Sequence, residues 1–137
     1  MIVLDASVLT DFLLGRGPTV AALESELASS DQAPLHAPEL IDLETLNALR
    51  RLARAGVVTD QRSTEAASDL ADARLIRYPH APLRARVWQL RHNLTAYDAA
   101  YLALAEALDD PLLMTADAGL ASAARASLGA RRVRQLS

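Results

Sequence analysis

Two short apolar runs, each followed closely by an aspartate, constrain most strongly how this chain folds. Residues 2–5 read Ile-Val-Leu-Asp, and residues 111–115 read Pro-Leu-Leu-Met-Thr, with Asp117 two positions further on. Short runs rich in aliphatic residues, without polar alternation, are typical of strands buried on both faces of a parallel sheet. The sequence therefore predicts two central parallel strands, each leading to a carboxylate.

The remaining chain alternates helical patterns with shorter strand patterns. We expect further strands over residues 34–37, 75–78 and 133–136, and helices over residues 7–14, 19–28, 38–55, 59–73, 83–92, 95–108 and 118–127. Pro38 suits the first position of its helix, and residues 29–32 suit a loop. This alternation predicts an α/β fold, a three-layer α/β/α sandwich with a mainly parallel central sheet. The length predicts a single domain over residues 1–137.

The composition excludes several kinds of chemistry. The chain has no cysteine, so disulfide frameworks, thiolate catalysis and cysteine-based zinc sites are excluded. All 14 basic residues are arginine, which excludes P-loop nucleotide binding and Schiff-base catalysis, because both need a lysine. We expect a cytoplasmic protein without a membrane span, since no apolar run approaches about 18 residues and Met1 opens directly onto a strand.

Three aspartates occupy positions where ligands bind in parallel sheets. Such ligands lie beyond the carboxyl ends of the strands, which is where Asp5 and Asp117 stand. Asp98 is expected in the first turn of the helix that begins near Thr95. Each aspartate has an alternative interpretation, because Asp and Thr at the start of a helix commonly cap its free N–H groups. Taken singly, the aspartates leave both interpretations open.

The alternative interpretation as a helix cap does not apply to Glu44. It is predicted within the helix of residues 38–55, where a side chain has no capping role, and Asn47 lies on the same face three residues on. A polar stripe on an apolar helix indicates a polar partner, and clustered carboxylates there need a cation. Asp42 lies on another side of the helix and is expected at the surface.

The donor types predict which cation this is. Carboxylate oxygens without cysteine favour Mg²⁺ or Mn²⁺ over zinc. The three histidines, His36, His80 and His92, are scattered and are expected at the surface or in loops. One or two such ions polarise a phosphodiester and activate water, so the pattern predicts metal-assisted hydrolysis.

The whole chain resembles PIN domains, in particular the VapC-type ribonuclease toxins of bacterial type II toxin–antitoxin pairs. The matching segments are residues 2–7, 38–47, 97–105 and 113–117. The resemblance implies that the metal ligands and catalytic acids are Asp5, Glu44, Asp98 and Asp117. It also implies that Ser7, Asn47 and Thr115 orient the ligands or water. Gly119 departs from the pattern, since many relatives carry a further acid there, and this predicts weak binding of a second metal.

The resemblance further implies a function. It predicts a metal-dependent endoribonuclease that leaves 5′-phosphate and 3′-hydroxyl ends, is neutralised by a cognate antitoxin and forms a homodimer. The formal charge of −3 becomes +1 without the four acids, so the rest of the surface can bind RNA. Candidate phosphate contacts are Arg50, Arg51 and Arg54, and also Arg84, Arg86 and Arg91. The aromatic residues are expected to pack in the core or in a dimer: Phe12, Trp88, Tyr97 and Tyr101.

One alternative function stays open. The chain could be a PIN fold with a degenerate site that binds RNA or a protein without cleaving anything. Phospho-acceptor signalling modules and haloacid-dehalogenase-type phosphatases also gather acids beyond a parallel sheet. The first needs a lysine in its pocket, and the second needs an aspartate where Ser7 stands, so both are disfavoured.

Overall fold

A five-stranded parallel sheet forms the centre of the molecule in a computed structural model, which describes residues 1–29 and 34–136. The strand order is β3-β2-β1-β4-β5, and every neighbouring pair runs parallel. The strands are β1 (Ile2–Leu4), β2 (Leu35–Pro38), β3 (Leu75–Tyr78), β4 (Leu112–Thr115) and β5 (Val133–Gln135). The two strands predicted to be central, β1 and β4, are adjacent in the middle of the sheet.

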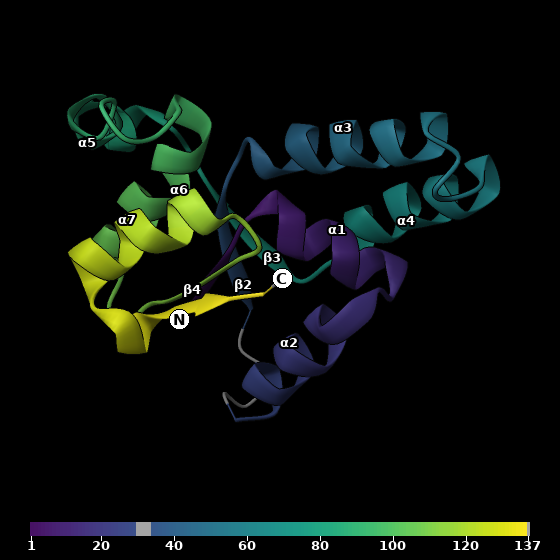
Figure 1. Ribbon diagram of the computed structural model, residues 1–137, viewed down its shortest axis with the longest axis horizontal. Helices are drawn as coiled ribbons and strands as arrows, with labels where there is room; N and C mark the ends of the chain where they lie inside the picture. Colours follow the sequence, from purple (N-terminus) through teal and green to yellow (C-terminus); the bar gives the residue numbers. More distant parts are fainter. Residues whose placement is uncertain (30–33, 137) are drawn as a thin grey trace.

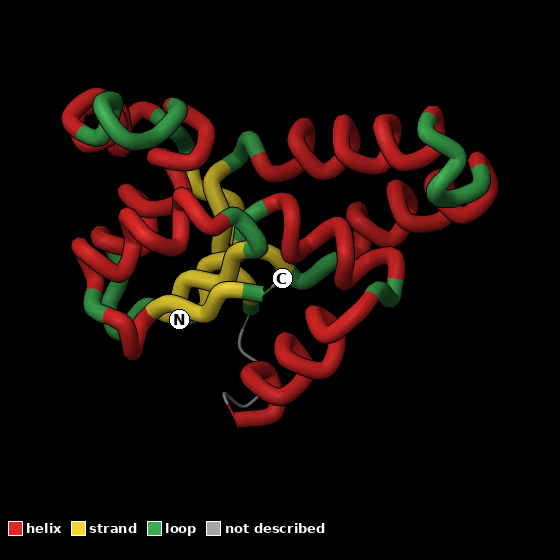
Figure 2. The backbone as a smooth tube through the Cα atoms, in the orientation of Figure 1, coloured by secondary structure: helices red, strands yellow, loops and turns green. Residues whose placement is uncertain are grey.

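Helices cover both faces of the sheet, as Figures 1 and 2 show. One layer contains α1 (Ala6–Leu14), α2 (Gly17–Ser29), α3 (Ile41–Arg54) and α4 (Asp60–Asp72). The other contains α5 (Arg84–Gln89), α6 (Ala96–Ala107) and α7 (Ala118–Leu128). Short 3₁₀ turns, η1 (Ala81–Leu83) and η2 (Ala130–Arg132), precede α5 and β5. The predicted three-layer α/β/α sandwich is confirmed.

The core lies on both faces of the central strands. Val3, Leu4, Leu113 and Met114 have no exposed surface, as expected for aliphatic strands between two helical layers. Residues 99–105 of α6 are also buried, because their alanines let the helix pack closely against the sheet. Among the described residues, no helix is long and apolar enough to cross a membrane.

Two helices begin or end at other residues than predicted. The helix predicted over residues 38–55 begins at Ile41, because Pro38 instead continues β2 in register with Tyr78. The helix predicted over residues 83–92 is a 3₁₀ turn followed by α5, which ends at Gln89. No residue of α5 is buried, so little tertiary packing extends it. Of the loop predicted over residues 29–32, Ser29 belongs to α2 and the rest lies outside the described residues.

The prediction for His36 is wrong as well. This residue lies in β2 with 5% of its surface exposed. Its Nδ1 lies 2.7 Å from the Tyr78 hydroxyl, which satisfies the buried ring. His80 and His92 are exposed as expected. Asp42 is partly exposed and receives two hydrogen bonds from Arg77, at 2.7 and 2.8 Å, which join α3 to β3.

Candidate active site

Four acidic residues from different parts of the fold line one cleft at the carboxyl edge of the sheet. Asp5 follows β1, Asp117 follows β4, Asp98 lies in the first turn of α6, and Glu44 lies on α3. The cleft has a volume of about 220 Å³, and Ser7, Asn47, Arg51 and Tyr101 also line it. Parallel register explains the meeting of Asp5 and Asp117, because β1 and β4 are neighbours that end at the same edge.

Asp5 is the most constrained of the four acids. Only 4% of its surface is exposed. Its Oδ1 accepts hydrogen bonds from the Ser7 hydroxyl at 2.5 Å and from the Val8 amide at 3.1 Å. Its Oδ2 accepts one from the Thr115 hydroxyl. Since a carboxylate has about four acceptor positions, Asp5 keeps one for a further ligand.

The same two hydroxyls attach the loop after β4 to Asp5. Ser7 Oγ accepts a hydrogen bond from the amide of Ala116 at 3.1 Å, and Thr115 Oγ1 accepts one from the amide of Asp117 at 2.9 Å. Each hydroxyl therefore donates to Asp5 and accepts from the loop. The arrangement fixes Asp117 relative to Asp5 through two side chains that the sequence singled out.

The capping interpretation is also correct for Asp5 and Asp117, and capping does not prevent either carboxylate from lining the cleft. Asp5 Oδ1 caps α1 through Val8, and Asp117 Oδ1 accepts from the Leu120 amide at 2.7 Å to cap α7. In α6 the cap is Thr95, whose hydroxyl accepts from the Asp98 amide. Capping orients the carboxylates of Asp5 and Asp117 at the edge where they also face the cleft.

Glu44 occupies the first turn of α3 rather than its middle, because the helix begins later than predicted. It is nevertheless not the N-cap of that helix, because Leu40 stands at that position. Instead, the hydroxyl of Tyr101 on α6 donates to Glu44 Oε1 at 2.6 Å.

Tyr101 is the residue of the cleft that sequence reasoning missed. It was expected only to pack, and it does, with 1% of its surface exposed. Its place three residues after Asp98 puts both side chains on one face of α6, and this spacing is the signal that could have revealed it.

Burial and mutual repulsion shift Asp5, Glu44 and Asp98 toward their protonated forms. Desolvation raises the pKa of Asp5, and it raises the pKa of Glu44 despite the hydrogen bond from Tyr101. Desolvation, followed by the charges of Asp117, Asp5 and Glu44, raises the pKa of Asp98 to about 6. Such a site gains free energy from any cation that enters it.

The donor set fits a hard divalent cation. Among the described residues, no three acidic or histidine side chains are close enough together to hold one ion as they stand. Mg²⁺ is commonly held by one or two carboxylates while it keeps several waters, so it does not require a closed cage. All-oxygen donors, with hydroxyls and the Asn47 amide beside them, are the ligand types that Mg²⁺ and Mn²⁺ prefer.

Gly119 lies next to this donor set. A Cβ at this position would stand 3.2 Å from Asp117 Oδ1. A side chain there would therefore lie against the carboxylate of Asp117, at the place where the expected fifth acid is missing.

Only one of the three arginines predicted on α3 to contact RNA reaches the cleft. Arg51 lines it, and its positive charge partly offsets the rise in the pKa of Glu44 that desolvation causes. Arg50 and Arg54 are exposed and lie outside the residues that line it.

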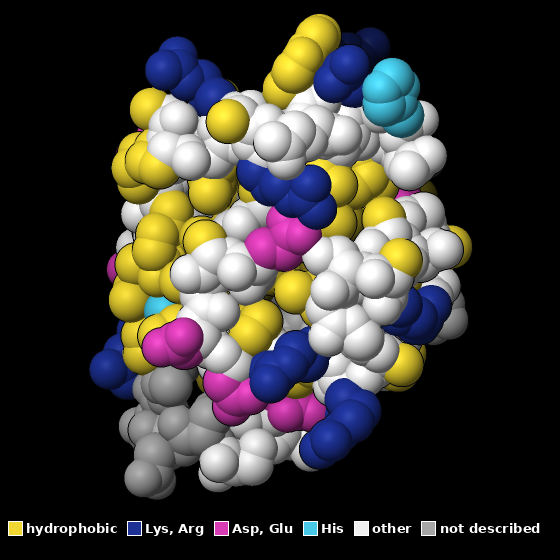
Figure 3. Space-filling view, turned by 90° about the vertical axis from the view of Figure 1, so that its left-hand side faces the viewer, with side chains coloured by type: hydrophobic (Ala, Val, Ile, Leu, Met, Phe, Trp, Pro, Cys, Tyr) yellow, Lys and Arg dark blue, Asp and Glu magenta, His cyan; other side chains and the backbone are white. Residues whose placement is uncertain are grey.

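The arginines of the α5 region have other contacts. Arg86 forms two hydrogen bonds to Glu106, at 2.7 and 2.8 Å, and Arg91 lies 4.4 Å over the ring of Trp88. On the face shown in Figure 3, arginine side chains are interspersed with acidic and hydrophobic ones.

Comparison with known proteins places the chain in a family. The PIN domain model matches residues 2–126. The crystal structure of PAE2754 from Pyrobaculum aerophilum superimposes with a TM-score of 0.66 at 25% identity, covering 96% of this chain and 81% of that chain. The chain therefore belongs to the PIN-domain family.

Relatives within this family carry a more specific name. Ribonuclease VapC1 of Mycobacterium tuberculosis is 47% identical over 126 residues, which cover 88% of this chain and 89% of that protein. Ribonuclease VapC9 of the same species is 40% identical over 129 residues, which cover 92% and 93%. The resemblance to VapC ribonucleases is thus confirmed over nearly the whole chain.

Proposed function

We propose that this protein is a divalent-metal-dependent endoribonuclease, the toxin of a toxin–antitoxin pair. The observation that supports this most is the meeting of four acids in one cleft, with Asp5 held by Ser7 and Thr115. All four positions implied by the resemblance carry an acid here, which disfavours the alternative of a degenerate, non-cleaving PIN fold. The relatives named VapC ribonuclease support the same activity.

The residues proposed to hold Mg²⁺ or Mn²⁺ are Asp5, Glu44, Asp98 and Asp117. A divalent ion held by these residues would polarise a phosphodiester and activate water for in-line attack, and the products would carry 5′-phosphate and 3′-hydroxyl ends. Ser7 and Thr115 restrict Asp5 to one orientation, and Tyr101 does the same for Glu44. Preorganised ligands lose little entropy when the site fills.

Arg51 is the side chain proposed to meet the RNA at the cleft. Its guanidinium carries the positive charge among the residues that line the cleft, and a planar fork of donors suits a phosphate group. Asn47 is exposed beside it on the same helix and is proposed to orient water or the phosphate.

Partners are proposed from the relatives and from an apolar surface. A cognate antitoxin is implied by the resemblance to VapC toxins. A homodimer is supported by exposed apolar side chains on α3, α5 and α6: Leu43, Leu46, Trp88 and Tyr97 are between 41% and 73% exposed. An apolar cavity of about 290 Å³ is lined by residues of η1, α5 and α6, including Trp88 and Tyr97, and by Leu40, which precedes α3. Exposed apolar surface of this kind marks protein contacts.

Cleavage of RNA by the Glu44→Gln variant tests the proposal. We expect wild-type cleavage with Mg²⁺ and none in EDTA, and collapse of cleavage in E44Q. In EDTA, E44Q should melt higher, because removing one of several like charges stabilises the metal-free protein by about 1 kcal/mol. Glu39→Gln is the matched control, since Glu39 is exposed and lies outside the cleft. If E44Q cleaves as well as E39Q, Glu44 is not part of the active site.

A further inference from the structure

A second and larger cavity lies at the opposite edge of the sheet. Ile2 and Leu112, the first residues of β1 and β4, line it, so it opens at the amino ends of the strands. Its volume is about 550 Å³. Thr115, at the other end of β4, donates to Asp5 of the acid cleft, which places the two sites at opposite ends of one four-residue strand.

Three arginines from one short segment give this cavity its chemistry. Arg131, Arg132 and Arg134 all line it, against two carboxylates, Asp110 and Glu26. The side chains that line the cavity therefore carry a net charge of +1, although the whole chain carries −3. Local charge rather than net charge decides what a site attracts.

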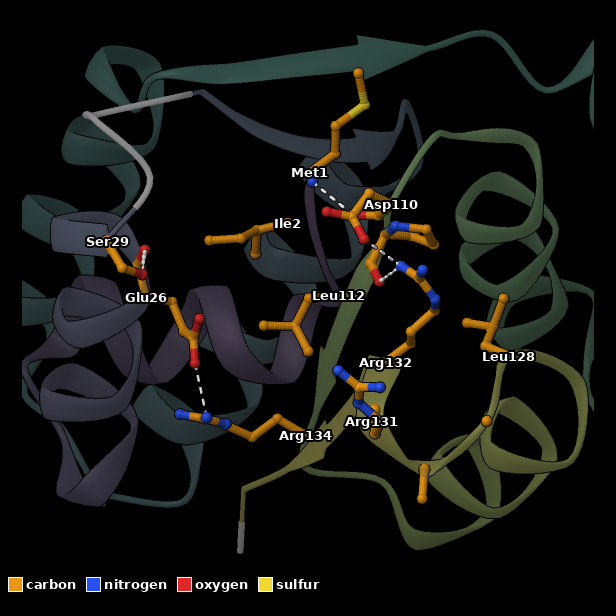
Figure 4. Close-up of a pocket in the computed structure, with 13 residues that line it drawn as sticks. Met1, Ile2, Glu26, Ser29, Asp110, Leu112, Leu128, Arg131, Arg132 and Arg134 are labelled. Carbon is orange, nitrogen blue, oxygen red and sulfur yellow. Dashed lines mark hydrogen bonds and ion pairs between the residues drawn. The ribbon is translucent and has the colours of Figure 1, made fainter.

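Two of the arginines are held in place from opposite walls. Arg132 Nη1 donates to Asp110 Oδ1 at 2.6 Å, and Arg134 Nη2 lies 2.7 Å from Glu26 Oε1 (Figure 4). The Asp110 side chain is 87% exposed, so solvent screens that pair and an incoming anion can compete with it. Each guanidinium has five N–H donors, which leaves donors for a ligand.

Arg131 differs from its two neighbours. Within residues 1–29 and 34–136, its side chain forms no hydrogen bond or ion pair, and it is exposed. It precedes the anchored Arg132 directly on η2. The segment therefore presents one uncompensated guanidinium beside two that are already oriented.

We propose that this cavity binds the phosphate group of a nucleotide. Asp110 pairs with Arg132 and Glu26 pairs with Arg134, whereas a phosphate has enough oxygens to contact two guanidinium groups at once. The volume lies within the range of about 300–1,000 Å³ that is usual for small-ligand sites. The phosphate comes either from an RNA strand that also enters the acid cleft or from a free nucleotide.

Arg131→Gln is the variant that tests this site. It removes one charge without breaking an ion pair, so the fold is retained. Arg16→Gln is the matched control, because Arg16 is exposed and lies outside the cavity. Binding is measured in EDTA, with a single-stranded RNA oligonucleotide by fluorescence anisotropy and with AMP by calorimetry. Without metal the RNA stays intact, so the result does not depend on the proposed ribonuclease activity.

The outcomes separate the two sources of phosphate. Loss of RNA affinity in R131Q alone, with the slope of log K against log salt reduced by about 0.7, assigns the site to the RNA strand. Loss of AMP binding in R131Q, with RNA binding unchanged, assigns it to a free nucleotide. The proposal is overturned if R131Q binds both probes like the wild type, or if R16Q weakens binding equally.

Discussion

At the scale of single residues, the cleft depends on pairs of residues that are far apart in the sequence and meet in the folded chain. The sequence could place Asp5, Asp98 and Asp117 at helix starts, because these positions follow local patterns. It could not show that Glu44 meets Tyr101, since these residues are 57 positions apart on different helices. Local periodicity predicts which face of a helix is polar, whereas the partner depends on how α3 and α6 pack.

Tyr101→Phe should leave the Glu44 carboxylate free to move while all four acids stay in the cleft. The variant loses a hydrogen bond to a carboxylate, which costs on the order of 1–3 kcal/mol in stability. We also expect a higher Mn²⁺ concentration for half-maximal RNA cleavage, because Glu44 is no longer held. Tyr97→Phe, whose ring is 64% exposed on the same helix, is the control. A Y101F variant with unchanged metal dependence would show that the hydroxyl has only a structural role.

Asp98 makes the stability of the metal-free protein depend on pH. Its pKa of about 6 in the folded state lies above the ordinary 3.8, so folding favours the protonated form. Ionised Asp98 therefore destabilises the protein above pH 6, and this effect fades as the pH falls toward 4. In urea unfolding with EDTA, Asp98→Asn should be more stable than wild type at pH 7, and the difference should shrink by pH 5. A constant difference would contradict the assigned pKa.

At the scale of helices and strands, most elements lie where the sequence predicts them, and the two errors of extent lie at Pro38 and in α5. β1 and β4 are buried on both faces, so their aliphatic runs were sufficient to predict two central parallel strands. Pro38 was misplaced because proline suits both the end of a strand and the start of a helix, and pairing with β3 decided the outcome. α5 is short because it buries no residue, and periodicity alone does not measure tertiary packing.

Thr115→Val should weaken the junction between β4 and α7. The variant removes a donor to Asp5 and an acceptor for the Asp117 amide, leaving buried polar groups unpaired at a cost of about 1–3 kcal/mol. Thr10→Val is the matched control, since the buried Thr10 hydroxyl has no hydrogen-bond partner among the described residues. We expect thermal unfolding to shift down only in T115V. Equal effects of both substitutions would mean that the threonine hydroxyl does not hold the junction.

At the scale of the whole molecule, the exposed apolar side chains of Leu43, Leu46, Trp88 and Tyr97 are the surface proposed to bind a second copy of the chain. Leu43→Arg should dissociate the proposed homodimer, because burying an unpaired charge in an interface is costly. Val57→Arg is the control, since Val57 is 56% exposed outside that surface. Light scattering after size-exclusion chromatography reports the mass. A wild-type monomer, or an L43R dimer as stable as the wild type, would rule out this interface.

The central claim is that the acid cleft binds a divalent metal, and calorimetric titration with Mn²⁺ at pH 7.5 tests it most directly. Each carboxylate that ligates the ion contributes to affinity, so E44Q and D98N should bind Mn²⁺ at least about tenfold more weakly than wild type, the range seen when supporting groups of metal sites are removed. E39Q should bind like the wild type. Wild-type protein that takes up no Mn²⁺, or E44Q and D98N variants that bind it as tightly as E39Q, would contradict the account.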